Sequence, residues 1–110
     1  MNNSKERYED MKCGEELMRI KCYYNKNLKM SPEKLAAQVG HVVLKIADNY
    51  GVDNPYKENT IVVLKASATK FKEYQQTLTE EGYPVFVQKD LGLTEVDAGT
   101  ETVFGYVEDL

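Results

Sequence analysis

The fold is decided by residues 18–51, which have the sequence MRIKCYYNKNLKMSPEKLAAQVGHVVLKIADNYG. Its first part alternates: Ile20, Cys22 and Tyr24 point to one side of an extended chain. The intervening side chains, Arg19, Lys21 and Tyr23, point to the other side. Alternation in a segment enriched in β-forming residues predicts a strand over residues 18–25.

A helix is predicted directly after this strand. Ser31 can cap the helix, and Pro32 suits its first position because the N–H that proline lacks would be unpaired there. We expect the helix to run to about Asn49 and to end at Gly51. Apolar residues recur at helical spacing and would face a core, with a polar stripe one step away. The apolar set is Leu35, Val39, Val42 and Ile46, and the polar stripe is Lys34, Gln38, His41 and Lys45.

Three further strands are predicted in the rest of the chain. The continuous apolar run at residues 61–64 predicts a central strand that is covered on both faces. Residues 85–87 and 100–107 predict the third and fourth strands, and residues 52–59 and 89–99 are expected to be loops. The loop before the last strand is too short for a helical crossover, so we expect that strand to run antiparallel.

A second helix is predicted between the second and third strands. Ser67 or Thr69 can cap it, and Gly82 and Pro84 end it. Its apolar stripe is formed by Phe71, Tyr74 and Leu78. The alternation of elements predicts an α/β fold: a three-layer sandwich in which helices cover both faces of a four-stranded mixed β-sheet.

The length of 110 residues predicts a single domain, here residues 18–110. Residues 1–17 are polar and are expected to form a flexible or short helical arm. No apolar run approaches the roughly 20 residues that span a bilayer, and the first residues do not resemble a signal peptide. We therefore expect a soluble, cytoplasmic protein.

The cysteines and the histidine restrict the possible chemistry. Cys13 and Cys22 do not form a disulfide framework, and their spacing matches no zinc motif. His41 is the only histidine of the sequence, which excludes a metal site built from several histidines. No metal and no cofactor are expected.

The net charge of −4 argues against a nucleic-acid partner, but the charges are unevenly distributed. Residues 19–45 contain six lysines and arginines against Glu33 alone. Such segregation can place a basic patch on an acidic molecule. The alternative interpretation is a solvated lysine face without a ligand.

Lys34 is unusual because it lies near the third position of the first helix. A cation near the positive end of the helix dipole is disfavoured by about 0.3–1 kcal/mol. Sequences that break a local preference often do so at a functional site. A lysine beside free helical N–H groups could hold a phosphate or a developing oxyanion, although a surface lysine extending past the first turn is the simpler alternative. On the same stripe, His41 is interpreted as a supporting residue and not as a general base.

A second candidate group follows the third strand. Asp90 and Thr94 flank the loop there, and Thr102 lies at the start of the fourth strand. Loops at strand ends are where ligands bind in α/β sheets, and one carboxylate with two hydroxyls could orient a water. The alternative is turn chemistry, since these residue types favour turns for backbone reasons.

Two stretches resemble a known family. Residues 27–41, NLKMSPEKLAAQVGH, resemble the signature D-L-x-M-x-x-G-K-x-A-A-Q-x-x-H of type-2 peptidyl-tRNA hydrolases. Residues 90–105, DLGLTEVDAGTETVFG, resemble that family's D-A-G-x-T-x-[IV]-x-x-G-[ST]-x-T-V-L-G. The resemblance covers roughly residues 18–107, with Asn27 in place of the first aspartate and Glu33 in place of the glycine.

The resemblance implies a mixed four-stranded sheet, often dimeric, and metal-independent hydrolysis of the ester that joins a peptide to the 3′ end of tRNA. Asp90 would hold the ammonium of Lys34, which would stabilise an oxyanion or a terminal phosphate. A threonine would hold the attacking water. The catalytic set it implies is Lys34, Asp90, Thr94 and Thr102, and we place Gln38, His41, Lys29 and Lys45 at the substrate.

The expected partners are peptidyl-tRNA and a second copy of the chain. Two other functions stay open. One is a non-catalytic binding or regulatory relative with the same fold, which Glu33 and the acidic total would suit. The other is a hydrolase of a different small ester or amide.

Overall fold

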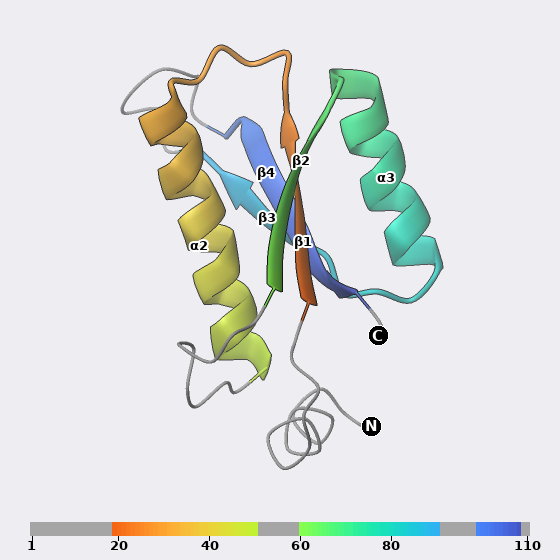
Figure 1. Cartoon of the computed structure of the whole chain (residues 1–110). Coiled ribbons are helices and arrows are strands. Elements are labelled where there is room, and N and C mark those ends of the chain that lie inside the picture. Colours follow the sequence, from red (N-terminus) through yellow and green to blue (C-terminus); the bar gives the residue numbers. More distant parts are fainter. Residues whose placement is uncertain (1–18, 51–59, 91–98, 109–110) are drawn as a thin grey trace.

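The computed structural model describes residues 19–50, 60–90 and 99–108. The predicted strands and helices are all present in these ranges and differ from the prediction only at their ends (Figure 1). The predicted arm and Gly51 lie outside the described residues, as do residues 52–59 and 91–98 of the predicted loops. The elements are β1 (Arg19–Asn25), α2 (Pro32–Tyr50), β2 (Thr60–Ala66), α3 (Ala68–Glu80), β3 (Phe86–Lys89) and β4 (Glu101–Glu108).

The strands form one mixed sheet in the order β2-β1-β4-β3. β1 and β2 are parallel, and β4 runs antiparallel to both of its neighbours, β1 and β3, as the sequence predicted. β1, β2 and β3 therefore point in the same direction. Their carboxyl ends meet at one side of the sheet, which we call the carboxyl edge; both helices begin at this edge (Figure 1).

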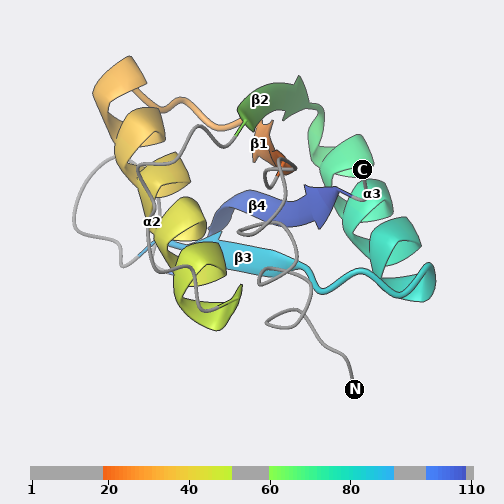
Figure 2. The same ribbon diagram turned by 60° about the horizontal axis from the view of Figure 1, so that its bottom comes forward.

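The helices lie on opposite faces of the sheet, which confirms the three-layer architecture (Figure 2). Alternation along β1 separates two cores, since Cys22 packs in the cluster under α2 and Tyr23 packs against the cluster under α3. The core under α2 contains Ile20, Cys22, Val42, Ile46, Tyr50, Val103 and Val107. The core under α3 contains Ala66, Phe71 and Phe104.

The prediction that residues 61–64 form a central strand, covered on both faces, is wrong. β2 is an edge strand, and its side chains Ile61 and Val63 are 49% and 42% exposed. The cause lies in the position of α2, which packs on β1, β3 and β4. An apolar run specifies a strand, but it does not specify where in the sheet that strand lies.

Serine caps set the starts of both helices. The Oγ of Ser31 accepts a hydrogen bond from the Lys34 N–H at 3.1 Å, which places Lys34 in the first turn of α2. Ser67, and not Thr69, caps α3, because its Oγ accepts from the Lys70 N–H at 3.2 Å. After α3 the chain turns at Gly82, whose φ of +95° lies in the left-handed region that favours glycine.

Gly105 lies where β4 passes under α2, and this position has no room for a side chain. An added Cβ would lie 2.7 Å from Cγ1 of Val42 and 3.1 Å from Sγ of Cys22, both of which are fully buried. Gly105→Ala is therefore expected to lower the free energy of unfolding by about 1–3 kcal/mol, because the core must shift to accept it.

Urea denaturation followed by circular dichroism measures this effect. Gly40→Ala in α2 is the matched control, because a Cβ there meets no atom within 4 Å. Alanine is favoured over glycine inside a helix by about 0.5–1 kcal/mol, so the control should be more stable than the wild type. Equal stability of the two variants would contradict the packing described for Gly105.

Candidate active site

The candidate site lies at the carboxyl edge, where β3 ends. Asp90 is the first residue after β3. Its N–H donates to the carbonyl of Thr100 at 2.8 Å, and its carbonyl accepts from the Gly99 N–H at 2.7 Å. Gly99 has a φ of +84°, a conformation that glycine adopts without strain. These bonds join the two ends of the β3–β4 connection and hold the backbone of Asp90 in place.

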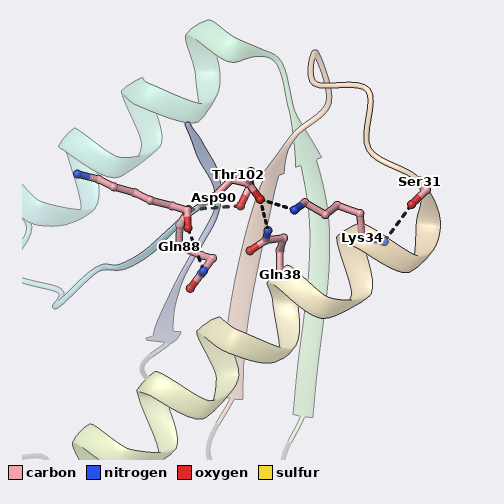
Figure 3. A network of polar contacts seen from close by, with 7 residues as sticks. Ser31, Lys34, Gln38, Gln88, Asp90 and Thr102 are labelled. Atoms are coloured by element: carbon pink, nitrogen blue, oxygen red, sulfur yellow. Dashed lines mark hydrogen bonds and ion pairs between the residues drawn. The ribbon is translucent and has the colours of Figure 1, made fainter. Parts of the chain in front are cut away.

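The carboxylate of Asp90 is buried and receives two donors from α2 (Figure 3). The ammonium of Lys34 forms an ion pair with Oδ1, and Nε2 of Gln38 donates to the same oxygen at 3.1 Å. The side chain of Asp90 is 2% exposed and that of Lys34 is 12% exposed. A charge so far removed from water is tolerated only when it is paired and hydrogen-bonded. Residues four apart on a helix lie on the same side, so one stripe of α2 supplies both donors.

The amide of Gln38 has only one reasonable orientation here. A carboxylate accepts hydrogen bonds and cannot donate them, so the amide must present its N–H group to Asp90. Figure 3 shows the amide oxygen directed away from Asp90. This oxygen is buried, and it has no hydrogen-bond partner among the described residues. It is therefore an acceptor at the site for an N–H or O–H group.

Thr102 lies at a β-bulge beside this carboxylate (Figure 3). Gln88 pairs with Val103 and Lys89 pairs with Glu101, so Thr102 is the extra residue of β4. Its side chain is fully buried, and its hydroxyl donates to the Gln88 carbonyl at 3.3 Å. A hydroxyl that donates one hydrogen bond still has lone pairs that can accept another.

A polar clamp attaches this end of β4 to α3. Glu101 accepts hydrogen bonds from Nζ of Lys72 at 2.7 Å and from Nε2 of Gln75 at 3.2 Å. The hydrogen bond from Lys72 holds the pKa of the Glu101 carboxyl below its usual value, against the opposing effect of partial burial. Because Glu101 directly precedes Thr102, the clamp supports the bulge that carries the Thr102 hydroxyl.

A second clamp positions the start of α2. The Lys26 N–H donates to the carbonyl of Ala66 at 2.9 Å, and Oδ1 of Asn27 accepts from the Ala68 N–H at 2.6 Å. The β1–α2 loop is thus attached to the end of β2 and to the first residue of α3. Asn27 stands where the signature has aspartate, and both side chains offer an oxygen that can accept this hydrogen bond.

The predicted site residues do not all lie together. The structure brings Lys34, Gln38 and Asp90 into contact, whereas Thr94 lies outside the described residues. His41 and Lys29 are exposed, and Lys45 is exposed with its Nζ donating to the Val87 carbonyl at 2.9 Å. The catalytic and binding roles of all of these residues stay predictions.

Sequence reasoning assigned no role to Asn27, Gln88 or the Glu101–Lys72 pair. Asn27 follows a strand and can accept backbone hydrogen bonds, a signal that was present in the sequence. No local pattern indicates that Gln88 or Glu101 contacts the site region, because their partners are distant along the chain.

A family model described as peptidyl-tRNA hydrolase PTH2 matches residues 18–107. The chain belongs to this family. The match includes both motifs and confirms the resemblance found in the sequence. Members of this family are hydrolases, and the reaction of the family is the hydrolysis of peptidyl-tRNA.

The only cysteine among the described residues of this PTH2 family member, Cys22, is not suited to act as a nucleophile. Cys22 is fully buried, and burial raises the pKa of its thiol to about 11, so the thiolate nucleophile is not formed near neutral pH. Within residues 19–50, 60–90 and 99–108, no three His, Cys, Asp or Glu side chains gather as metal ligands would. None of the helices in those ranges is long and apolar enough to cross a membrane.

The Asn27 clamp predicts how this PTH2 family member responds to two substitutions. Asn27→Ala removes the acceptor for the Ala68 N–H and should lower the free energy of unfolding by about 0.5–1.5 kcal/mol. Asn27→Asp keeps the acceptor and adds a negative charge at the start of α3, which favours the helix by about 0.3–1 kcal/mol. Urea denaturation of both variants is the measurement. If Asn27→Asp lost as much stability as Asn27→Ala, the hydrogen bond to the Ala68 N–H would not be the source of the stabilisation.

The Glu101 clamp predicts a pH dependence. Because the pKa of Glu101 is lowered in the folded state, the clamp stabilises the fold above the usual carboxyl pKa of about 4.5 and is lost as the pH falls through the lower, folded value. At neutral pH, Glu101→Gln should be less stable than the wild type by at most about 1 kcal/mol, since Lys72 is largely exposed. The difference should vanish in acid. Thermal unfolding from neutral to acidic pH tests this, and a difference independent of pH would exclude the charge of Glu101 as its cause.

Proposed function

We propose that this protein hydrolyses the ester bond between a peptide, or an N-blocked amino acid, and the 3′ end of tRNA, and so recycles peptidyl-tRNA. One observation carries the proposal. Each of the two family motifs contributes one member of the Lys34–Asp90 pair, and these residues are separated by 56 positions in the chain. The pair lies at the carboxyl edge, where α/β sheets bind their ligands.

The proposed mechanism uses Lys34 as an electrostatic catalyst. An aminoacyl ester is activated, so direct attack by water is feasible and no covalent intermediate is required. Water attacks the carbonyl carbon, and the negative charge that develops on the carbonyl oxygen is stabilised by the Lys34 ammonium. The proton leaves the water for Asp90 and is returned to the departing 3′ oxygen of the tRNA.

The attacking water needs acceptors that aim its lone pair at the carbonyl carbon. We assign this role to Thr102 and to Thr94. The Thr102 oxygen retains the capacity to accept, and its place on the bulge is rigid because its own proton is directed to the Gln88 carbonyl. The buried amide oxygen of Gln38 is a further acceptor, suited to this water or to a substrate N–H group.

The proposal includes the setting of the reaction. The enzyme would act in the cytoplasm, and it would need neither a metal nor another cofactor. It would act as a homodimer, and light scattering of the purified protein would measure this oligomeric state. Its partner would be peptidyl-tRNA. His41, Lys29 and Lys45 would contact the substrate outside the reaction centre, a role compatible with their exposure.

The decisive experiment is hydrolysis of N-acetyl-aminoacyl-tRNA by the wild type and two variants. Lys34→Ala and Asp90→Asn should each lower kcat/KM by about 100-fold or more, as expected when one group that stabilises the transition state is lost. Asp90→Asn preserves the shape of the side chain and keeps an oxygen that can accept from Lys34, although it removes the counter-charge of the Lys34 ammonium. Lys21→Gln removes a cation from the opposite end of β1 and should retain activity.

Folding must be checked for each variant by circular dichroism. A wild type that releases no acyl amino acid, under conditions in which another peptidyl-tRNA hydrolase is active, would exclude the proposed activity and favour a binding module. Activity that survives both substitutions in folded protein would reject the site but keep the reaction.

A further inference from the structure

The side-chain amide of Gln38 is buried at the candidate site, but the described part of the chain uses only its nitrogen. Gln38 is 5% exposed, and its Nε2 donates to Oδ1 of Asp90 at 3.1 Å. Its Oε1 is also buried and accepts no hydrogen bond within residues 19–50, 60–90 and 99–108. Buried side-chain oxygens nearly always have a donor, so an unpaired one at a candidate site calls for an explanation.

The amide cannot turn over to give this oxygen a different neighbour. Turning it would place the oxygen against the carboxylate of Asp90, and two buried acceptors would then face each other. The hydroxyl of Thr102 does not supply a donor either, because its proton is directed to the Gln88 carbonyl at 3.3 Å. The Gln38 oxygen is therefore set up to accept from a ligand.

A donor and an acceptor lie close together at one carboxylate oxygen. The Lys34 ammonium and the Gln38 Nε2 both contact Oδ1 of Asp90, and the unpaired Gln38 oxygen is bonded to the same carbon as that nitrogen. Lys34 supplies N–H donors, whereas the Gln38 oxygen can only accept. A ligand that satisfies both must present an acceptor and a donor within the length of one amino-acid residue.

The residue that is esterified to the tRNA, which we call the terminal residue, presents this pattern beside its ester. Its carbonyl oxygen accepts, its α-nitrogen donates, and a single Cα joins the two groups. In the proposed mechanism Lys34 holds the carbonyl oxygen, which brings the α-nitrogen of the same residue towards Gln38. When a peptide or an acetyl group blocks this nitrogen, the nitrogen carries one N–H, and the site has one unpaired acceptor for it.

We propose that the Gln38 oxygen accepts a hydrogen bond from the α-N–H of the terminal residue, and that Gln38 thereby determines which terminal residues are accepted. This inference rests on the proposed function and specifies its substrates. A blocked proline has no N–H, because its ring occupies the remaining valence of the nitrogen. Peptidyl-tRNA that ends in proline, or in another N-alkylated residue, is therefore a poor substrate.

The burial of the Gln38 oxygen favours a ligand that brings its own donor. The oxygen is closed to solvent, whereas the side chain of Lys34 is 12% exposed. A ligand that enters beside Lys34 must open the way to the oxygen, and side chains at binding sites commonly change rotamer when a ligand binds. A substrate with an N–H gains a hydrogen bond by this opening, and a substrate without one leaves the acceptor unpaired.

Two other donors could meet the same oxygen: a buried water, and the 2′-hydroxyl of the terminal ribose. Both stay available when the α-N–H of the substrate is replaced. Only the proposed contact depends on that N–H, so the decisive change is made in the substrate and not in the protein.

The experiment compares N-acetylglycyl-tRNA with two analogues that lack the N–H. N-acetylsarcosyl-tRNA carries a methyl group on the nitrogen, and O-acetylglycolyl-tRNA has an oxygen in its place and nearly the same shape as the parent substrate. Cleavage of the ester to the tRNA is measured. Each rate is divided by the spontaneous rate of the same ester, which corrects for differences in reactivity.

The three substrates are tested with the wild type, Gln38→Met and Gln76→Met. Methionine has about the length of glutamine and no amide. Gln76 is exposed on α3, where its Nε2 donates to Glu80 at 3.2 Å, so Gln76→Met is the matched control.

The wild type and Gln76→Met should prefer the substrate with the N–H by about 10-fold or more in kcat/KM, as expected when a buried acceptor loses its donor. Gln38→Met should be slower on all three substrates, because the hydrogen bond to Asp90 is lost as well. It should, however, no longer prefer the substrate with the N–H.

Two results would overturn the inference. One is a wild type that does not distinguish the three substrates, which would assign the Gln38 oxygen to a water or to the ribose. The other is an undiminished preference in folded Gln38→Met. The first result needs no variant, so it is decisive even if Gln38→Met does not fold.

If the wild type hydrolyses none of the three substrates, the proposed function fails by itself. Binding of stable 3′-amide analogues, N-acetylglycyl-adenosine and O-acetylglycolyl-adenosine, is then measured by calorimetry. Tighter binding of the analogue with the α-N–H would support the Gln38 contact, and equal binding would exclude it.

Discussion

The carboxylate of Asp90 is almost completely removed from water, and much of the surrounding structure follows from this constraint. An ionised carboxylate in such a place is stable only with a cation and further donors at hydrogen-bonding distance. Lys34 and Gln38 meet both requirements from one stripe of α2. The first turn of α2 must therefore lie against the end of β3, although these elements are far apart in the sequence.

The sheet topology makes this meeting possible. β4 lies between β1 and β3 and runs antiparallel to both, so that β1 and β3 end at the same edge. The loop after β1 leads into α2, which lies over β1, β4 and β3 and carries Lys34 to Asp90. Polar contacts stabilise the arrangement at its margins: Asn27 attaches the loop to α3, and Glu101 attaches the start of β4 to the same helix. Such exposed contacts add little stability singly, but they restrict the geometry of the ends where the site lies.

How far the sequence predicts this structure depends on the range of the interactions. Periodicity and caps act within a few residues, and they predicted β1, α2 and α3 well, including Ser31 as a cap. The position of β2 in the sheet depends on which strands α2 covers. The apolar run at residues 61–64 carries no information on this, and the central strand that it predicted is an edge strand. Lys34 was found because it conflicts with the helix dipole, a local signal, whereas its contact with Asp90 could be expected only from the resemblance of two motifs. The roles of Gln88 and Glu101 arise from a bulge and from contacts between β4 and α3, which no local pattern encodes.

The net charge of the chain is likewise a poor guide to the electrostatic field at the candidate site. A total of −4 suggests repulsion of nucleic acid, yet a polyanion responds to the charges within about one Debye length of its path and not to the sum over the chain. The Lys34–Asp90 pair contributes little to that field, because its two charges nearly cancel and both are shielded from solvent. The paired lysine is therefore suited to act on charge that develops within the proposed site, and it does little to attract a polyanion from solution.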